Sequence, residues 1–374
     1  MKTRAEPRGT REARRAQDAA LAVFLLLLVL AFAFVAVWGR GGTRERDPGE
    51  ERAALSMRAA MLALRSELGS RGISIDPLSD LNGSGLIGLP WSGITTTLGS
   101  LPAKRSAAQP ASAVMMRRFL RDAGVGAGDL VAIDSSGSFP GFAIAAIIAA
   151  EGLGAKTIVL TSVGSSTWGA NRPEFALPDM LLFLASRGIV SHGPGAVSPG
   201  GDGDAGRDMD ATELGHVLAR ASSGGARLLG APDLSADIVA RRALIARAAG
   251  GGRPAVFVSI GGNLPATGPG DSLSGRSGLL RPSNFPGRRA PGIGLVQSYL
   301  AEGIPVIRLI DVKDLAARTG LPYDPHPWPP DPAMPAPSAA RPWLAAFPCL
   351  ALAVAFFVRK RHAGSKAENG PRTT

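Results

Sequence analysis

The stretch from Asp129 to Asn171 constrains the fold more than any other part of the chain. It contains a short apolar run at 130–133, a polar turn, an Ala/Ile-rich run at 141–151, a second apolar run at 157–160 and a second polar turn. Short β-branched runs bounded by Gly/Ser turns are typical of buried strands, and the longer Ala/Ile run is typical of a helix. The stretch therefore predicts a βαβ unit of a parallel sheet with helices on both faces.

Similar signals continue on both sides of this unit. We expect helices at 111–123, 174–187, 212–221, 233–249, 293–302 and 311–318, and strands at 189–190, 255–260 and 306–310. Strands that alternate with helices indicate the α/β class. Residues 111–320 are therefore predicted to form a Rossmann-like domain with a mostly parallel sheet and helices on both faces.

Two apolar stretches with basic flanks predict membrane anchoring. The uncharged run at 19–38 matches the ~20 residues that cross a bilayer core, and a shorter run lies at 343–358. Basic tails at 1–18 and 359–374 lie outside these runs, so the positive-inside rule puts both tails in the cytoplasm and the domain outside the cytoplasmic (inner) membrane. A cleaved signal peptide is the alternative for the first run, whose length exceeds the usual ~7–15 apolar residues.

The segments between the expected spans and the domain are less regular. We assign 39–110 to a stalk and irregular segment, in which the helical spacing at 52–68 fits either a stalk or a first domain helix. Residues 92–107 could cross the face of the domain as a loop. Residues 321–342 are rich in proline and predict an extended spacer.

Charge and composition exclude several classes of function. The formal net charge is +11, but much of the excess lies in the two tails, and the chain has no basic stripe interleaved with aromatic residues, so no nucleic-acid partner is expected. A phosphate-binding P-loop is absent and no cofactor is expected. The acidic stretch at 193–210 lacks the spacing and closing Glu of a calcium loop, so Asp202, Asp204, Asp208 and Asp210 are expected in a solvated loop without a metal.

Three polar turns follow three of the expected strands. In open parallel sheets, ligands bind beyond the carboxyl ends of the strands, and backbone amides at a helix N-terminus suit a carboxylate or a phosphate. We therefore expect the turns to share one crevice, although Gly and Ser are also ordinary turn residues. The candidate ligand-binding residues are Asp134, Ser135, Ser136, Ser138, Ser162, Ser165, Ser166, Trp168, Asn171, Gly261, Gly262 and Asn263.

An extracytoplasmic Ser-dependent hydrolase or transferase that acts on a polymer or the cell wall is an alternative reading of the same turns. Ser136 or Ser138 would be the nucleophile, and His192, which follows an expected strand, is the only plausible base. The chain has no G-x-S-x-G elbow and no convincing terminal block that would complete a triad. A catalytic role is therefore the second reading, after a binding role.

The motifs S-G-S-F-P, S-V-G-S-S-T-W-G-A-N and S-I-G-G-N resemble those of the poly-γ-glutamate system protein family. Members of this family accompany the capsule-type poly-γ-glutamate ligase and its membrane partners in bacteria. The resemblance covers roughly residues 110–311 and the N-terminal anchor. It implies an accessory role in synthesis or export of an anionic polymer, with the membrane subunits of that system as partners, but it supplies no reaction. A sensor of a carboxylate such as glutamate is a further alternative.

Overall fold

The computed structural model describes residues 47–329, apart from 231–232, 271–272, 274 and 285–293, together with Phe24, Leu25 and Leu28. The chain divides into the unit Arg46–Pro335 and a unit made of Met1–Glu45 and Ala336–Thr374. Among the described residues, no helix is both long and apolar enough to cross a membrane. The expected spans at 19–38 and 343–358 and the two basic tails lie outside the described residues, apart from those three positions.

A seven-stranded sheet forms the centre of the Arg46–Pro335 unit. Its strands are β2 (Leu130–Ser135), β3 (Lys156–Ser162), β5 (Ala196–Ser198), β6 (Arg227–Leu228), β7 (Val256–Ile260), β8 (Gly278–Leu280) and β9 (Val306–Leu309). They lie in the order β6-β5-β3-β2-β7-β9-β8, and all neighbours are parallel except β8, which runs antiparallel to β9. The prediction of a mostly parallel α/β sheet is confirmed.

The strand order places a topological switch point between β2 and β7. The chain runs outward from β2 to β3, β5 and β6, and then returns across the sheet to add β7 and β9 on the other side. At such a point the crossovers diverge to opposite faces and leave a crevice at the carboxyl ends of the strands. Asp134 of β2 lies in register with Ser259 of β7 there.

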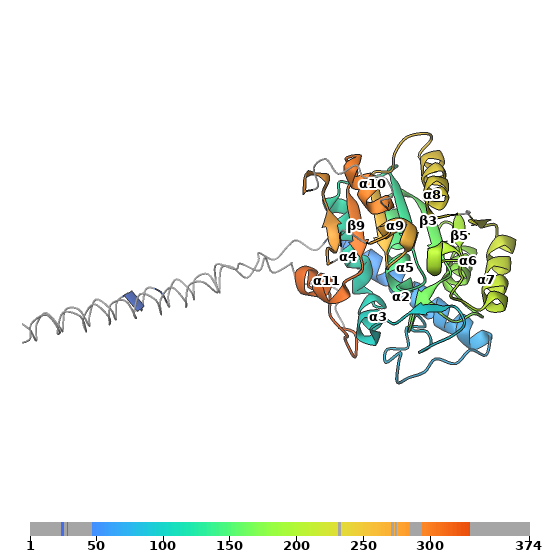
Figure 1. Cartoon of the computed structure of the whole chain (residues 1–374). Coiled ribbons are helices and arrows are strands. Elements are labelled where there is room, and N and C mark those ends of the chain that lie inside the picture. Colours follow the sequence, from blue (N-terminus) through green and yellow to red (C-terminus); the bar gives the residue numbers. More distant parts are fainter. Residues whose placement is uncertain are drawn as a thin grey trace, which may run out of the picture. The chain divides into compact units, whose positions relative to one another are not determined.

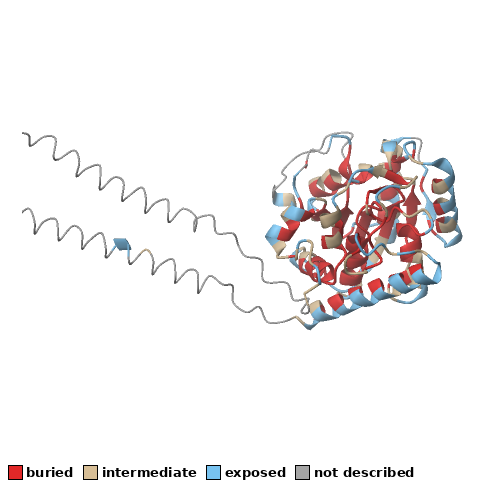
Figure 2. Ribbon diagram, turned by 90° about the horizontal axis from the view of Figure 1, so that it is seen from below, coloured by how far each residue is buried: buried red, intermediate tan, exposed pale blue. Residues whose placement is uncertain are grey.

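Helices cover both faces of the sheet (Figure 1). The helices are α2 (Pro48–Ser70), α3 (Leu101–Ala107), α4 (Ala111–Asp122), α5 (Pro140–Glu151), α6 (Leu177–Ser186), α7 (Ala211–Ser223), α8 (Leu234–Ala248), α9 (Leu264–Thr267), α10 (Leu295–Ala301) and α11 (Val312–Thr319), with 3-10 turns at Asp202–Asp204 and Pro282–Asn284. One face packs against α4, α5, α6 and α11, and the other packs against α8, α9 and α10. The buried residues run through the centre of these layers (Figure 2).

The sequence of α5 explains its central place. Its residues from Pro140 to Ala150 are all buried, because the helix lies between the sheet on one side and α2 and α4 on the other. A helix that is apolar all round is stable only when it is enclosed in this way. Pro140 occupies the first turn, where the missing N–H costs no helical hydrogen bond.

Of the two alternatives for the helical segment at 52–68, the structure shows the first domain helix and not the stalk. Helix α2 packs against α4, α5 and α6, and its inner stripe includes Met57 and Leu64. The Leu55 and Leu62 positions face outward instead. Ion pairs fasten the start of this helix to α4, since Arg117 contacts Asp47 at 3.0 Å and Arg118 contacts Glu50 at 2.8 Å. The domain therefore begins near residue 47 and not at 111.

Two other expected elements differ from the structure. The strand expected at 189–190 is absent, and β5 lies at Ala196–Ser198 instead, after a turn that follows α6. The helix expected at 174–187 begins only at Leu177, and Pro178 lies in its first turn, where it removes no helical hydrogen bond. The start of the expected spacer also packs on the domain, where Pro322 accepts a hydrogen bond from Gln109.

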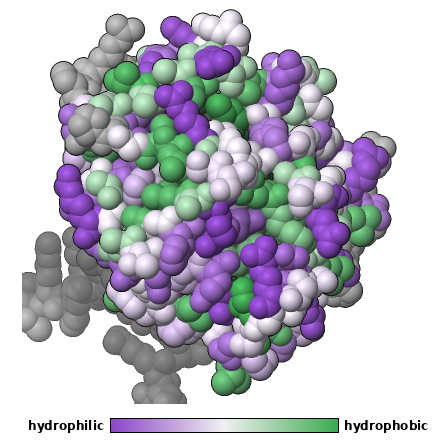
Figure 3. Space-filling view, turned by 90° about the vertical axis from the view of Figure 1, so that its right-hand side faces the viewer, coloured by the Kyte–Doolittle hydropathy of each residue, from purple (hydrophilic) through white to green (hydrophobic). Residues whose placement is uncertain are grey.

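The face drawn in Figure 3, on the side where Figure 1 shows α7, mixes polar and apolar side chains. Purple side chains separate the green areas over most of this view. A mixed surface of this kind is normal for a folded domain. It does not by itself indicate a binding site, so the carboxyl edge of the sheet is the place to look for one.

The packing of α2 predicts unequal effects of two neighbouring leucine substitutions. Leu64 is 0% exposed and Leu62 is 59% exposed. Leu64→Ala should lower the free energy of unfolding by about 2–5 kcal/mol, because it leaves a cavity under the helix. Leu62→Ala is the matched control on the same helix and should change it by less than about 1 kcal/mol. Urea unfolding followed by tryptophan fluorescence measures both, and equal small effects would mean that α2 is a stalk after all.

Candidate functional site

The three polar turns meet at the carboxyl edge of the sheet. Ser136 N–H donates to Ile260 O at 3.1 Å, which joins the turn after β2 to the end of β7. Gly137 N–H donates to Gly164 O at 3.0 Å, and Ser166 N–H donates to Ser138 Oγ at 3.1 Å. The turns after β2, β3 and β7 therefore lie side by side. That they line one ligand crevice stays a prediction.

These contacts use most of the amides that we expected to hold an anion. Gly164 N–H donates to Pro199 O, Thr167 N–H donates to Thr97 O and Ala170 N–H donates to Gly137 O. A backbone donor that is already bonded gives little to a ligand. Gly262 differs, because it is exposed and its N–H has no partner among the described residues.

Gly261 is required by the close approach of two turns. Its φ of 78° lies in the left-handed region, and an added Cβ would lie 2.4 Å from Ser136 Oγ. Any other residue would clash there and would also be strained. This glycine brings the turn after β7 against the turn after β2.

Asn171 and Trp168 hold a neighbouring segment and do not face a ligand space. Asn171 Oδ1 accepts from Leu89 N–H at 2.7 Å, and its Nδ2 donates to Leu89 O and to Thr95 Oγ1, each at 2.9 Å. Trp168 N–H donates to Leu89 O at 2.8 Å. The 86–97 segment, which ends in β1 (Thr95–Thr97), is thereby fixed over the second turn, where β1 pairs with β4 (Ser165–Ser166).

The other predicted serines lie in the same place but are engaged locally or buried. Ser135 Oγ donates to Ser136 O and Ser165 Oγ donates to Ser166 O, both at 2.9 Å. Ser162 ends β3 and is 2% exposed. These side chains shape the turns. The candidates that remain are Ser136, Ser138 and Asn263, whose side chains are also buried, beside the exposed Gly262.

A buried arginine gathers three aspartates beside the turns. Arg241 of α8 is 0% exposed, and its guanidinium contacts Asp134 at 2.8 Å, Asp204 at 2.8 Å and Asp237 at 2.7 Å. Asn263 Nδ2 donates to the same Asp134 oxygen at 2.7 Å. The expectation of a solvated acidic loop is therefore wrong for Asp204, because its carboxylate is drawn into the interior by this cation.

Burial raises the pKa of Asp134 to about 7, although Arg241 opposes the shift, and the carboxylates of Asp204 and Asp237 add to it. Burial likewise raises the pKa of Asp204. Asp134 Oδ2 has no hydrogen-bond partner among the described residues, so it is the oxygen that can carry the proton while Oδ1 keeps its two bonds. The cluster can therefore hold or release a proton near neutral pH.

Lys104 is a functional candidate that the sequence reasoning missed. It is 3% exposed, its Nζ lies 2.6 Å from Ser166 Oγ and also contacts Ser138 O, and it sits 3.9 Å from the centre of the Phe139 ring. Burial lowers its pKa to about 7. The available signal was the residue type, because lysine is rare beside arginine in this chain and only lysine can lose its charge near neutral pH.

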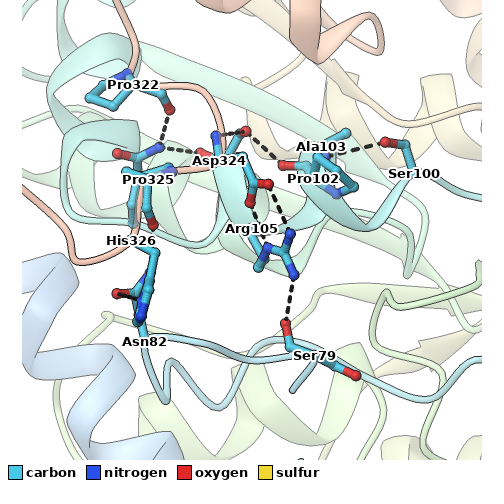
Figure 4. A network of polar contacts seen from close by, with 12 residues as sticks. Ser79, Asn82, Ser100, Pro102, Ala103, Arg105, Pro322, Asp324, Pro325 and His326 are labelled. Carbon is cyan, nitrogen blue, oxygen red and sulfur yellow. Dashed lines mark hydrogen bonds and ion pairs between the residues drawn. The ribbon is translucent and has the colours of Figure 1, made fainter. Parts of the chain in front are cut away.

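The helix that carries Lys104 is fixed from its other side. Figure 4 shows Arg105 paired with Asp324, at 2.5 Å from Nε, and linked to Ser79 O. Asn82 Nδ2 donates to Pro325 O at 2.8 Å in the same network. These contacts tie the end of the described chain to α3, so that Lys104 is held against the turns by a braced helix.

His192 lies away from the serines that it was expected to serve. Its Nε2 is 2.9 Å from Thr157 Oγ1, near the amino end of β3. Ser162 ends that strand five residues later, which at ~3.3 Å per residue is about 16 Å away. His192 is therefore not the base for Ser136 or Ser138. Among the described residues, no group of three or more His, Cys, Asp or Glu side chains is arranged to hold a metal ion.

A cavity of about 900 Å³ lies at the opposite edge of the sheet. It is lined by residues of α8 and α10, including Arg242 and Tyr299, and by Arg253 and Pro254, which precede β7. Arg242 is already paired there with Glu302 at 2.6 Å. None of the predicted site residues lines this cavity, so its size does not make it the better candidate.

The strongest chemical feature of the domain is thus a pair of buried titratable groups on either side of one turn. Asp134 precedes the Ser136–Ser138 turn and Lys104 packs against it, and burial moves both pKa values toward neutrality. Such perturbed groups concentrate at functional sites. Comparison of the chain with protein-family models, with curated proteins and with solved structures found no match.

Arg241 and Arg242 provide a direct test of the buried cluster. Arg241→Ala should lower the free energy of unfolding by about 3–5 kcal/mol, because it leaves buried carboxylates without their cation. The side chain of Arg242 is 36% exposed in its ion pair, so Arg242→Ala should cost no more than about 1 kcal/mol. Chemical denaturation of the two variants makes the comparison, and similar losses would contradict the assignment of Arg241 as the central cation.

The raised pKa of Asp134 predicts a pH dependence of stability. The folded protein keeps this proton up to about pH 7, whereas the unfolded chain releases it near pH ~4. Because the folded state binds more protons in this window, the contribution of Asp134 to stability is present below it and is lost as the pH rises through it. Asp134→Asn cannot titrate, so from pH 4.5 to 7.5 it should lose less stability than the wild type, by on the order of 2 kcal/mol. Urea unfolding at several pH values tests this, and parallel profiles would argue against it.

Proposed function

We propose that this chain is a membrane-anchored accessory protein of poly-γ-glutamate synthesis or export that binds the carboxylate-bearing polymer at the switch point. The observation that carries the proposal is the convergence of the three turns between the carboxyl ends of β2, β3 and β7. Open α/β sheets bind their ligands at this position. The motifs that resemble the poly-γ-glutamate system family lie in these same turns.

We call the exposed Gly262 and the three buried polar residues beside it the switch-point mouth: Ser136, Ser138, Gly262 and Asn263. Gly262 is exposed, and a Cβ added to it would meet no heavy atom within 4 Å. Its N–H is a free donor among the described residues, and Ser138 Oγ accepts from Ser166 N–H, which leaves the hydroxyl hydrogen available. Donors of this kind suit a carboxylate.

The aspartate cluster beneath the mouth opposes an anionic ligand less than its three carboxylates suggest. Asp134 carries less than a full negative charge near pH 7, because burial raises its pKa to about 7. The cluster beneath the mouth therefore repels a carboxylate less than three ionised aspartates would.

The proposed position of the domain outside the membrane follows from the two apolar stretches of the sequence, and it indicates which partners the domain would meet. Spans at 19–38 and 343–358 would hold the domain outside the cytoplasmic membrane, next to the membrane subunits that synthesise or export the polymer. In that position the mouth would receive the chain end of the polymer. A binding role at the membrane agrees with the absence of a triad built on Ser136, Ser138 and His192.

Gly262 gives the sharpest test of the mouth. Gly262→Leu places a side chain in open space at the mouth and should weaken binding of a γ-linked glutamate oligomer at least ~10-fold, because the bulk covers the free amide. Gly215→Leu is the matched control, since Gly215 is exposed on α7 and an added Cβ there also meets nothing within 4 Å. Calorimetric titration of the purified chain measures both, and equal affinities would remove the mouth from the proposal.

The role in the cell is tested separately by polymer output. Cells that lack this chain should display less surface poly-γ-glutamate, and the Gly262→Leu chain should fail to restore it at normal protein levels. Unchanged polymer after deletion would overturn the assignment to this system. Thermal stabilisation by free glutamate alone, with no response to the oligomer, would favour a carboxylate sensor, because a ligand that binds only the native state raises stability by mass action.

A further inference from the structure

The contact between Lys104 and Ser166 has the geometry of a general base and its nucleophile. Lys104 Nζ lies 2.6 Å from Ser166 Oγ, within the range expected for proton transfer between such groups. Its second contact is with Ser138 O, a carbonyl that can only accept. A neutral Lys104 can therefore donate one hydrogen to Ser138 O and still use its lone pair to accept the Ser166 hydroxyl proton.

Among the described residues, no carboxylate contacts Lys104 and would hold it charged. Its described contacts are Ser138, Ser166, the Phe139 ring and, through its Cε, the neighbourhood of Gly99. The next cation on the same helix, Arg105, is paired with Asp324. Burial is the cause of the lowered pKa of Lys104, about 7, so a neutral amine is well populated at physiological pH. The Phe139 ring favours the charged form but does not neutralise it.

Gly99 packs closely over the pair, and its backbone is hydrogen-bonded to Thr167. A Cβ at residue 99 would lie 2.9 Å from Thr167 O and 3.0 Å from both Ser166 Oγ and Lys104 Cε. Any side chain there would cover the two groups, and the adjacent Leu98 and Ser100 are exposed. The pair therefore lies directly beneath the backbone of residues 98–100, and Ser166 itself is 7% exposed.

We propose that Ser166 and Lys104 form a Ser–Lys dyad that cleaves acyl bonds of small esters or amides. Lys104 Nζ takes the Ser166 Oγ proton as Oγ bonds to the acyl carbon, and the carbonyl electrons move to its oxygen. The carbonyl then re-forms, the leaving alcohol or amine departs with the proton from Lys104, and Ser166 holds the acyl group as an ester. Water attacks this ester with Lys104 as base, and the proton returns to Ser166 Oγ.

The net reaction consumes one water and releases an acid and an alcohol or amine. The dyad differs from the serine hydrolase expected from the sequence in both residues, because Ser166 replaces Ser136 or Ser138 and Lys104 replaces His192. It also does not depend on the proposed polymer binding, since neither residue belongs to the switch-point mouth.

A fluorophosphonate probe tests the dyad on the full chain. The Ser166 Oγ–phosphorus bond forms as the phosphorus–fluorine bond breaks, fluoride leaves and Lys104 takes the proton. We expect peptide mass spectrometry to locate the adduct on Ser166. The labelling rate should rise about tenfold per pH unit at low pH and level off above about pH 7, where Lys104 is neutral.

Variants separate catalysis from folding. Ser166→Ala should abolish the adduct, and Lys104→Met, which keeps the length of the buried chain without the base, should slow labelling at least ~100-fold. The exposed residues Lys156 and Ser186 supply matched controls, as Lys156→Met and Ser186→Ala. Unfolding midpoints of all four variants show whether a loss reflects the fold, and the pH profile of the wild type needs no variant at all.

Three results would overturn the dyad. These are no adduct on Ser166 in a folded wild-type chain, a labelling rate that is flat between pH 5 and 9, and an unchanged rate in folded Lys104→Met. Labelling that is lost in His192→Ala but kept in Lys104→Met would return the role of base to His192. Binding of the γ-glutamate oligomer by Lys104→Met would show that the binding proposal stands or falls on its own.

Discussion

The site depends on one buried interaction, the contact of Arg241 with Asp134, Asp204 and Asp237. It joins the central strand β2, the acidic loop after β5 and the returning helix α8 at the switch point. A buried cation with several carboxylates gains little net stability over apolar packing, but removing one partner is costly. Here the interaction fixes the position of the turn after β7. Arg241 and Asn263 donate to the same Asp134 oxygen, which holds Asn263 and its turn against β2.

The turns beyond the strands pack against one another and are joined by hydrogen bonds, so they do not form an open crevice. Hydrogen bonds between the turns use most of their backbone amides. The side chain of Asn171 is hydrogen-bonded to the 86–97 segment and is not available to a ligand. What remains is a small polar mouth beside Gly262 and a separate buried pair, Lys104 and Ser166, beneath Gly99. Binding and acyl chemistry are thus assigned to neighbouring but distinct groups of atoms, and the two ideas can fail independently.

Much of the fold follows from local sequence. The βαβ unit at 129–171 was predicted because apolar runs of strand and helix length alternate with Gly/Ser turns, and the convergence of the turns followed because parallel strands end at one edge. The local sequence pattern predicts short strands less well. The three residues of β5 carry too little signal to be separated from the apolar pair at 189–190, which lies in a turn.

The sequence by itself determined the α/β class, the order of most elements and the polar turns that lie at the switch point. The tertiary structure alone decided which side chains enter the interior. Arg241 and Arg242 are adjacent on α8, yet only Arg241 joins the inner stripe with Asp237 and Ile245. Leu64 is buried on α2 whereas Leu62 is not. In helices rich in Ala, Leu and Arg the local pattern leaves the inward face undecided. Packing against the sheet and the charges already buried there select it.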